Sequence, residues 1–239
     1  MQPSPPRSPF PILYQDGDLV VINKPDGMLV HRSPISRDEV FVLQCLRDQI
    51  CQRVFPVHRL DRPTSGALLF GLNREATRGL AGQFESGTVE KRYLAVVRGY
   101  TDDAGLIDHP LSHEDRPEPR DAVTRYRRLA TVELDIPVGR YPSSRYSLVE
   151  VHPGTGRMHQ IRRHFKHIFH PLIGDTTYGE GRHNRMFREH FGIERLLLHA
   201  SRVKLRHPVT GLCLRFEAPI PDDMQDLFAR LGWAENLPG

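Results

Sequence analysis

The chain has 239 residues, 38% of them hydrophobic, so it can bury one sizeable core or at most two small ones. Lys and Arg outnumber Asp and Glu by 33 to 29, a balance that permits a polyanionic partner without requiring one. No apolar run has the length of a membrane span or of a signal peptide core, so we expect a cytoplasmic protein. Residues 1–11 are Pro-rich and predict a disordered tail, and residues 12–239 predict a single domain.

The three cysteines are Cys45, Cys51 and Cys213. Their number is odd and no Cys-x-x-Cys pair occurs, so we expect reduced, buried thiols rather than a disulfide framework or a zinc ribbon. The basic residues gather in three stretches, which fit solvated faces as well as a nucleic-acid surface. These stretches contain Arg125, Arg127 and Arg128; Arg157, Arg162, Arg163 and Lys166; and Arg182, Arg185 and Arg188.

A hairpin and a helix are predicted at the start of the chain. Short apolar runs at residues 12–14 and 19–23 flank a polar turn, which is typical of a β-hairpin. Ser36 and Glu39 then have the spacing of a capping box and precede apolar residues at helical intervals. We therefore expect a helix over residues 37–52.

The most informative stretch is a polar segment between two apolar runs, residues 54–60 and 67–72, which predict a second hairpin. Pro63 restricts the backbone and Gly66 can take a positive φ, so this turn can hold the Asp61 carboxylate rigidly. Two flanking arginines should keep Asp61 ionised, which suits a nucleophile or an electrostatic stabiliser. The ordinary alternative is a surface turn that the aspartate merely caps.

A helix and a strand are predicted next. Asn73 is placed to cap a helix that Gly87 ends, and residues 91–99 alternate as a strand with Tyr93 and Val97 on one side. A tyrosine on a strand is most often a core aromatic.

The second half of the chain contains further strands. Residues 101–121 lack periodicity and predict a mobile surface connection. Residues 139–144 predict a loop between two strands, at a place where it could touch a substrate. The remaining predicted elements are strands at 123–134 and 145–151, a late hairpin of 196–205 with 212–218, and a helix at 222–231.

His164, His167 and His170 recur at every third residue, close to a metal-ligand pattern. Neither a nearby cysteine nor an HExxH string accompanies them. A polar helix face is therefore favoured over a metal site.

The string HRLDRPTSG at residues 58–66 resembles the HRLD-x-x-TSG signature of the RluA-type pseudouridine synthases, which isomerise uridine in RNA. Similar strings extend from about residue 19 to residue 221, so the resemblance covers nearly the whole chain. The other family-like strings are KPDGMLVH at 24–31, KRYLAVVRG at 91–99, GRMHQIRRH at 156–164, HPLIGDTTYG at 170–179 and HPVTG at 207–211.

The resemblance implies a role for five side chains. Asp61 matches the family's catalytic aspartate, and Arg162 matches the arginine that contacts it. Tyr93 matches the tyrosine that lies against the target base. Arg59 matches the arginine that enters the RNA as the base flips out, and its neighbour Arg62 is expected at a phosphate.

The resemblance also implies an α+β fold, with a mixed, mostly antiparallel sheet, flanking helices and a central RNA-binding cleft. We expect no S4 domain ahead of the catalytic part. Neither a cofactor nor a metal is implied, because the bond that breaks and the bond that forms both lie within the substrate nucleotide. One placed carboxylate can suffice for this isomerisation, whereas hydrolysis of a glycosidic bond normally calls for two.

The expected partner is tRNA, and we expect no membrane and a monomer. The strings at residues 31–33 and 139–142 most resemble a branch of the family that acts on uridine 65, in the TΨC arm of tRNA. A ribosomal RNA uridine is the alternative target, and a noncatalytic RNA-binding module is the alternative class. A metal-dependent hydrolase rests only on the three histidines.

Overall fold

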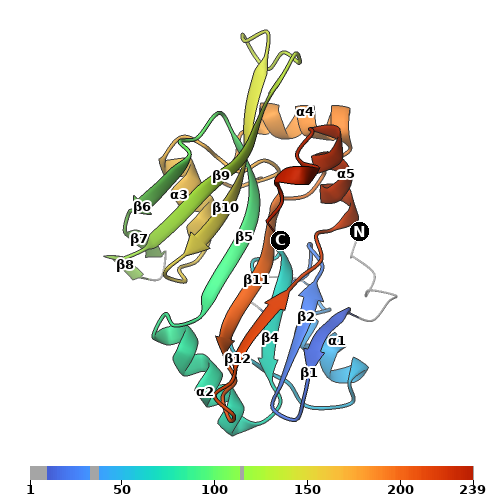
Figure 1. Cartoon of the computed structure of the whole chain (residues 1–239), viewed down its shortest axis with the longest axis vertical. Helices are drawn as coiled ribbons and strands as arrows, with labels where there is room; N and C mark the ends of the chain where they lie inside the picture. The colour runs from blue at the N-terminus through green and yellow to red at the C-terminus, as the bar shows by residue number, and fades with distance from the viewer. Residues whose placement is uncertain (1–9, 33–37, 114–115, 239) are drawn as a thin grey trace. The chain divides into compact units, whose positions relative to one another are not determined.

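A computed structural model describes residues 10–32, 38–113 and 116–238 (Figure 1). Residues 1–9 of the predicted tail lie outside this range. The prediction of disorder is wrong for Phe10, which is buried and whose backbone exchanges two hydrogen bonds with the Gln49 side chain, at 2.7 and 2.9 Å. Among the described residues, no helix is long and apolar enough to cross a membrane.

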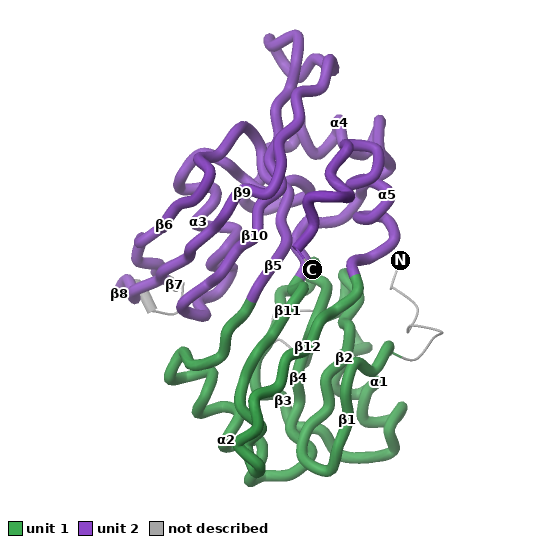
Figure 2. Tube along the Cα trace, in the orientation of Figure 1, with its two compact units in different colours: residues 1–91, 200–219 green, residues 92–199, 220–239 purple. Residues whose placement is uncertain are grey.

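The chain divides into two compact units (Figure 2). Unit 1 combines residues 1–91 with 200–219, and unit 2 combines residues 92–199 with 220–239. Strands β5 (Glu90–Arg98) and β11 (Leu198–Arg206) each begin in one unit and continue in the other. The single domain expected over residues 12–239 stays a prediction.

Unit 1 is built on strands in the order β1-β2-β4-β11, with β3 paired to β4 and β12 paired to β11. Every residue of β4 is buried, which explains why its sequence, SGALLFG, does not alternate. Leu80 of α2 packs into the core with Leu19 and Leu69. The elements are β1 (Ile12–Gln15), β2 (Leu19–Lys24), α1 (Val42–Gln49), β3 (Phe55–Pro56), β4 (Ser65–Gly71), α2 (Arg74–Glu85) and β12 (Cys213–Glu217).

Unit 2 has the strand order β5-β10-β9-β6, in antiparallel pairs, beside the separate pair β7-β8. Alternate residues of β5 enter different cores: Val96 packs with Trp233, whereas Val97 packs with Phe165. The elements are β6 (Ala104–Asp108), β7 (Leu111–His113), β8 (Arg116–Arg120), β9 (Val123–Leu134), β10 (Ser144–Pro153), α3 (Gln160–His167), α4 (Gly181–Phe191), α5 (Asp222–Arg230) and the 3-10 helix η1 (Ala234–Asn236).

These antiparallel pairings with flanking helices confirm the predicted α+β class. The helix predicted after Asn73 is also confirmed, since the Asn73 side chain accepts a hydrogen bond from the Ala76 amide at 2.9 Å. Gly87 follows the helix with a φ of 72°, in the left-handed region.

The predicted start of the first helix is wrong. Helix α1 begins at Val42, and Ser36 and residue 37 lie outside the described residues. The amides of Val42 and Leu43 donate to the carbonyls of Leu29 and Val30, each at 3.0 Å. The preceding loop therefore satisfies the first turn of the helix, and no side chain of Phe41 caps it.

Three further expectations need correction. The central hairpin is shorter than predicted, because β3 covers only Phe55–Pro56. Residues 101–121 are not a bare connection but carry β6, β7 and β8. Their sequence lacks periodicity because residues of β6 such as Leu106 stay exposed at the sheet edge. Cys51 and Cys213 are exposed rather than buried.

Candidate functional site

Asp61 lies in the loop that leads from β3 to β4 in unit 1. The Thr64 amide donates to the Asp61 carbonyl at 3.0 Å and closes a turn over residues 61–64. The Asp61 side chain is half-buried, between buried Leu60 and buried Thr64. The turn therefore presents one carboxylate on a backbone that is fixed at both ends.

The fully buried ammonium of Lys24, at the end of β2, stabilises this turn through hydrogen bonds to its backbone. Its Nζ donates to the carbonyls of Thr64 at 2.8 Å, Arg62 at 3.2 Å and Pro25 at 2.7 Å. Three acceptors offset much of the cost of burying an ammonium group. No role was predicted for Lys24, although it opens the KPDGMLVH string. The one sequence feature that pointed to this role is that Lys24 ends an apolar strand.

Arg62 ties the same turn to the loop that follows β2. Its Nε donates to the Gly27 carbonyl at 3.0 Å, and one terminal nitrogen lies 3.3 Å from the Asp38 carboxylate. Its side chain is still 47% exposed, so it remains accessible to a phosphate. Arg59 is exposed and has no ion-pair partner among the described residues. The two arginines therefore differ: one braces the loop and the other is available to a ligand.

His58 anchors the segment that enters the turn. Its Nε2 accepts a hydrogen bond from the Leu69 amide at 3.1 Å, and its ring stacks on Phe84 with centroids 4.4 Å apart. Burial, with a smaller contribution from the charge of Lys91, lowers the pKa of His58 to about 3. The imidazole is therefore neutral at pH 7, and it acts as a structural acceptor that links the loop to β4.

Gly66 follows the turn with φ of 117°. A Cβ atom at this position would lie 2.3 Å from the Ala200 carbonyl oxygen, well inside van der Waals contact. The close approach of β4 to β11 thus requires glycine here, in agreement with the predicted positive φ.

Tyr93 lies on β5, opposite Val151 of β10, and is half-buried in unit 2. It packs against the cluster that contains Ala95, Val97 and Phe165. This placement confirms the predicted strand face. Its predicted contact with a target base stays a prediction.

Arg162 forms a buried ion pair with Asp175 in unit 2. Its Nε and a terminal nitrogen lie 2.7 and 2.9 Å from the two carboxylate oxygens. Burial alone would raise the pKa of Asp175, but hydrogen bonds from Arg162 and from the amides of Tyr178 and Thr177 outweigh it and lower the pKa. Asp175 was not predicted as a partner, although the GD of the HPLIGDTTYG string contains it. The predicted pairing of Arg162 with Asp61 stays a prediction.

The three regularly spaced histidines do not share one site. His164 Nε2 lies 3.0 Å from the His109 carbonyl, and His170 Nδ1 lies 2.7 Å from the Arg98 carbonyl. His167 instead stacks on the His109 ring, with centroids 3.7 Å apart. His164 and His167 thus share His109 as a neighbour, whereas His170 contacts the backbone of Arg98.

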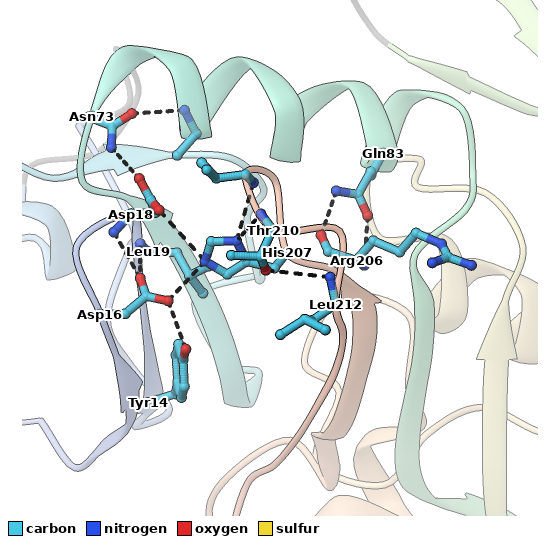
Figure 3. Close-up of polar contacts among 12 residues, drawn as sticks. Tyr14, Asp16, Asp18, Leu19, Asn73, Gln83, Arg206, His207, Thr210 and Leu212 are labelled. Carbon is cyan, nitrogen blue, oxygen red and sulfur yellow. Dashed lines mark hydrogen bonds and ion pairs between the residues drawn. The ribbon is translucent and has the colours of Figure 1, made fainter.

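Within the described part of the chain, one group has the spacing of metal ligands: Asp16, Asp18 and His207 (Figure 3). His207 Nε2 lies 2.9 Å from one Asp16 oxygen and 3.8 Å from Asp18. The other ring nitrogen, Nδ1, accepts hydrogen bonds from the amides of Val209 and Thr210 at 3.2 and 3.1 Å.

This arrangement fixes the tautomer of the His207 ring. Because Nδ1 is an acceptor, the proton of the neutral ring is on Nε2, which donates it to Asp16 and is not offered to a metal. Burial would raise the pKa of Asp16, but hydrogen bonds, led by the Leu19 amide and the Tyr14 hydroxyl, lower it. The group is best described as a lock between the β1–β2 turn and the β11–β12 turn.

The fold agrees with that of known proteins. A family model described as RNA pseudouridylate synthase matches residues 18–167. The chain belongs to this family, which confirms the prediction made from the HRLD string and identifies an isomerase.

Individual members of the family are similar to this chain over nearly its whole length. A tRNA pseudouridine synthase C of Salmonella typhi is 52% identical over 238 residues, covering 95% of this chain and 92% of that protein. The Haemophilus influenzae protein of the same name is 49% identical and covers 95% and 99%. A solved structure, human RNA pseudouridylate synthase domain containing 1, aligns with a TM-score of 0.71 at 28% identity, covering 92% of this chain and 87% of that one.

Proposed function

We propose that this protein converts a uridine of tRNA to pseudouridine, with Asp61 as the catalytic carboxylate. The observation that carries the proposal is the turn over residues 61–64, which buried Lys24 holds through the carbonyls of Arg62 and Thr64. Relatives named tRNA pseudouridine synthase C, about half identical over nearly the whole chain, support tRNA as the substrate.

The reaction is an isomerisation. The N1–C1′ bond breaks, the uracil turns and C5 forms a new bond to C1′, while a proton leaves C5 and N1 gains one. Asp61 can serve by attacking C1′, by attacking C6 of the ring or by removing the 2′ proton. Each route needs a single carboxylate held in one orientation, which the braced turn supplies.

Two residues of unit 2 complete the proposal. Arg162 orients the Asp61 carboxylate through the N–H groups that its pairing with Asp175 does not use, since a guanidinium has five N–H donors. Tyr93 stacks on the uracil while the ring turns.

Arg59 fills the space that the flipped uridine leaves in the RNA helix, and Arg62 meets a phosphate.

Replacement of Asp61 by Asn tests the catalytic role. The change removes a charge but little volume, so we expect loss of pseudouridine formation with tRNA affinity within about threefold of the wild type. The assay is tritium release from tRNA that carries 5-labelled uridine, together with filter binding. Appreciable turnover by Asp61→Asn would refute the assignment, and joint loss of binding and activity would make the residue structural.

The particular uridine is a separate part of the proposal. We infer uridine 65, in the TΨC arm, and a cytoplasmic location, where tRNA is the available substrate. Pseudouridine mapping of total RNA from cells with and without the gene should show one tRNA position that depends on the gene. A ribosomal RNA position that disappears instead would support the alternative target.

A further inference from the structure

Unit 2 contains a pocket of about 840 Å³ that the catalytic proposal does not use. Its walls are the connection between β9 and β10, the start of α4 and the end of β5. Its lining includes the charged and aromatic residues Arg98, Arg140, Tyr141, Arg145, Glu180 and Arg182.

The pocket is strongly basic, because its lining includes four arginines and one glutamate. The Glu180 carboxylate is already engaged by Arg98, and His183 Nε2 lies 3.8 Å from it. Arg145 is paired with Glu133 at 3.2 Å. These contacts leave the other two arginines as the source of unbalanced charge.

Arg140 and Arg182 have no carboxylate partner among the described residues, and both are exposed. The Arg182 guanidinium lies against Gly139, where a Cβ atom would come within 2.9 Å of it. Two guanidinium groups thus face one opening without an internal counter-ion. Such an arrangement attracts phosphate groups, to which arginine can donate two parallel hydrogen bonds.

An aromatic plane accompanies the charge. Tyr141 is 58% exposed, and the Arg140 guanidinium lies 5.1 Å from its ring centroid. A terminal nitrogen of Arg140 donates to the Tyr141 hydroxyl at 2.9 Å, which fixes the two side chains together. Exposed aromatic and guanidinium planes beside basic groups are the elements with which proteins bind unpaired nucleotides.

We propose that this pocket binds an unpaired nucleotide of the RNA substrate other than the target uridine. The base stacks on Tyr141, and the adjoining phosphates meet Arg140 and Arg182. Tyr93 and Arg98 are five residues apart on β5, which is about 16 Å along a strand. The pocket is therefore a contact separate from the base that Tyr93 is proposed to meet. This inference rests on the proposed function, because RNA is the polyanion it assumes.

Binding measurements on the full chain and tRNA test the stacking. Tyr141→Ala should weaken binding about 5- to 150-fold, whereas Tyr141→Phe, which keeps the ring, should stay within about threefold of the wild type. An affinity of Tyr141→Ala within twofold of the wild type would refute the proposal.

The charges are tested by the salt dependence of binding. Arg140→Ala and Arg182→Ala should each reduce the slope of log affinity against log salt by about 0.7, the value for one phosphate of a single strand. Arg188→Ala is the matched control, because Arg188 is an exposed arginine of α4 outside the pocket. An equal loss of slope in this control would show general attraction to RNA and overturn the assignment.

A photoreactive amino acid in place of Tyr141 identifies the occupant. We expect crosslinking to one unpaired nucleotide of tRNA; crosslinking to the target uridine or to a paired stem would contradict the proposal. None of these binding readouts needs turnover. If the variants lose RNA affinity as expected but the wild type makes no pseudouridine in tRNA, the proposed function alone is refuted. If the wild type makes pseudouridine in tRNA and Tyr141→Ala binds tRNA as tightly as the wild type, the pocket proposal alone is refuted.

Discussion

Arg162 and Asp175 form a two-pronged ion pair whose side chains are 4% and 1% exposed, with nitrogen–oxygen distances of 2.7 and 2.9 Å. The amides of Thr177 and Tyr178 also donate to Asp175, each at 2.9 Å. The guanidinium is therefore held in one orientation by its own unit. Any further acceptor meets an arginine that is already positioned.

Asp175→Asn should lower the free energy of unfolding by about 3 to 5 kcal/mol, because it removes the buried negative charge that lies 2.7 and 2.9 Å from the Arg162 guanidinium. Urea unfolding at pH 7 measures the loss. Asp226→Asn is the control, since Asp226 is exposed on α5 and should change stability by less than about 0.5 kcal/mol. A loss below about 1 kcal/mol in Asp175→Asn would show that the pair is not a main support of this region.

His58 should make stability depend on pH. Its pKa is about 3 in the folded protein, below its ordinary value of 6.5, so between these values the unfolded chain binds more protons than the folded one. Stability is therefore lost as pH falls from 6.5 towards 3, by at most about 1.4 kcal/mol per pH unit. His58→Gln should remove this component. Urea unfolding at pH 7.5 and 5 should show a smaller difference in the variant, and equal differences would contradict the lowered pKa of His58.

Gly66→Ala should destabilise the protein by about 3 kcal/mol or more, because its Cβ would overlap the Ala200 carbonyl at a φ that favours glycine. Gly82→Ala is the matched control, since Gly82 lies in α2 with no atom within 4 Å of the added Cβ. That change should instead stabilise by about 0.5 to 1 kcal/mol. Thermal or urea unfolding compares the two, and similar effects at both sites would refute the steric argument.

Arg59→Ala should slow the reaction on a paired target about 10- to 100-fold more than on the same uridine in an open loop. The reason is that unstacking and unpairing cost a few kcal/mol in a helix and less when the base is already exposed. Single-turnover rates on the two RNAs, each at two salt concentrations, provide the measurement. Equal losses on both RNAs, with a salt dependence reduced by about one charge, would identify a phosphate contact instead.

Local signals in the sequence identified much of the fold. Asn73 was recognised as a helix cap because its interaction is local, with an amide three residues away. Strands β9 and β10 were recognised from stretches that contain β-branched and aromatic residues, which favour strands. The start of α1 was not, because its first amides bond to Leu29 and Val30, in a loop that sequence periodicity does not connect to the helix.

In the candidate site, too, residues within a local sequence string were predicted and their partners distant in sequence were not. Asp61 was found from a string of adjacent residues. The support from Lys24 depends on a contact across 40 positions, and no local pattern shows that a lysine at the end of a strand is buried. Likewise, Arg162 was predicted, but its partner Asp175 lies 13 positions further on and was visible only as part of a family string.

The lock between Asp16 and His207 joins residues 191 positions apart, and it has a consequence for synthesis of the chain. Strand β11 and its hairpin partner β12 complete the sheet of unit 1 only after all of residues 92–199 have been made. At ribosomal rates of about 5–20 residues per second, β4 waits about 6 to 25 s with an apolar edge unpaired. The nascent chain is therefore exposed to aggregation during this interval, and chaperones that bind extended apolar segments should engage β4 in it.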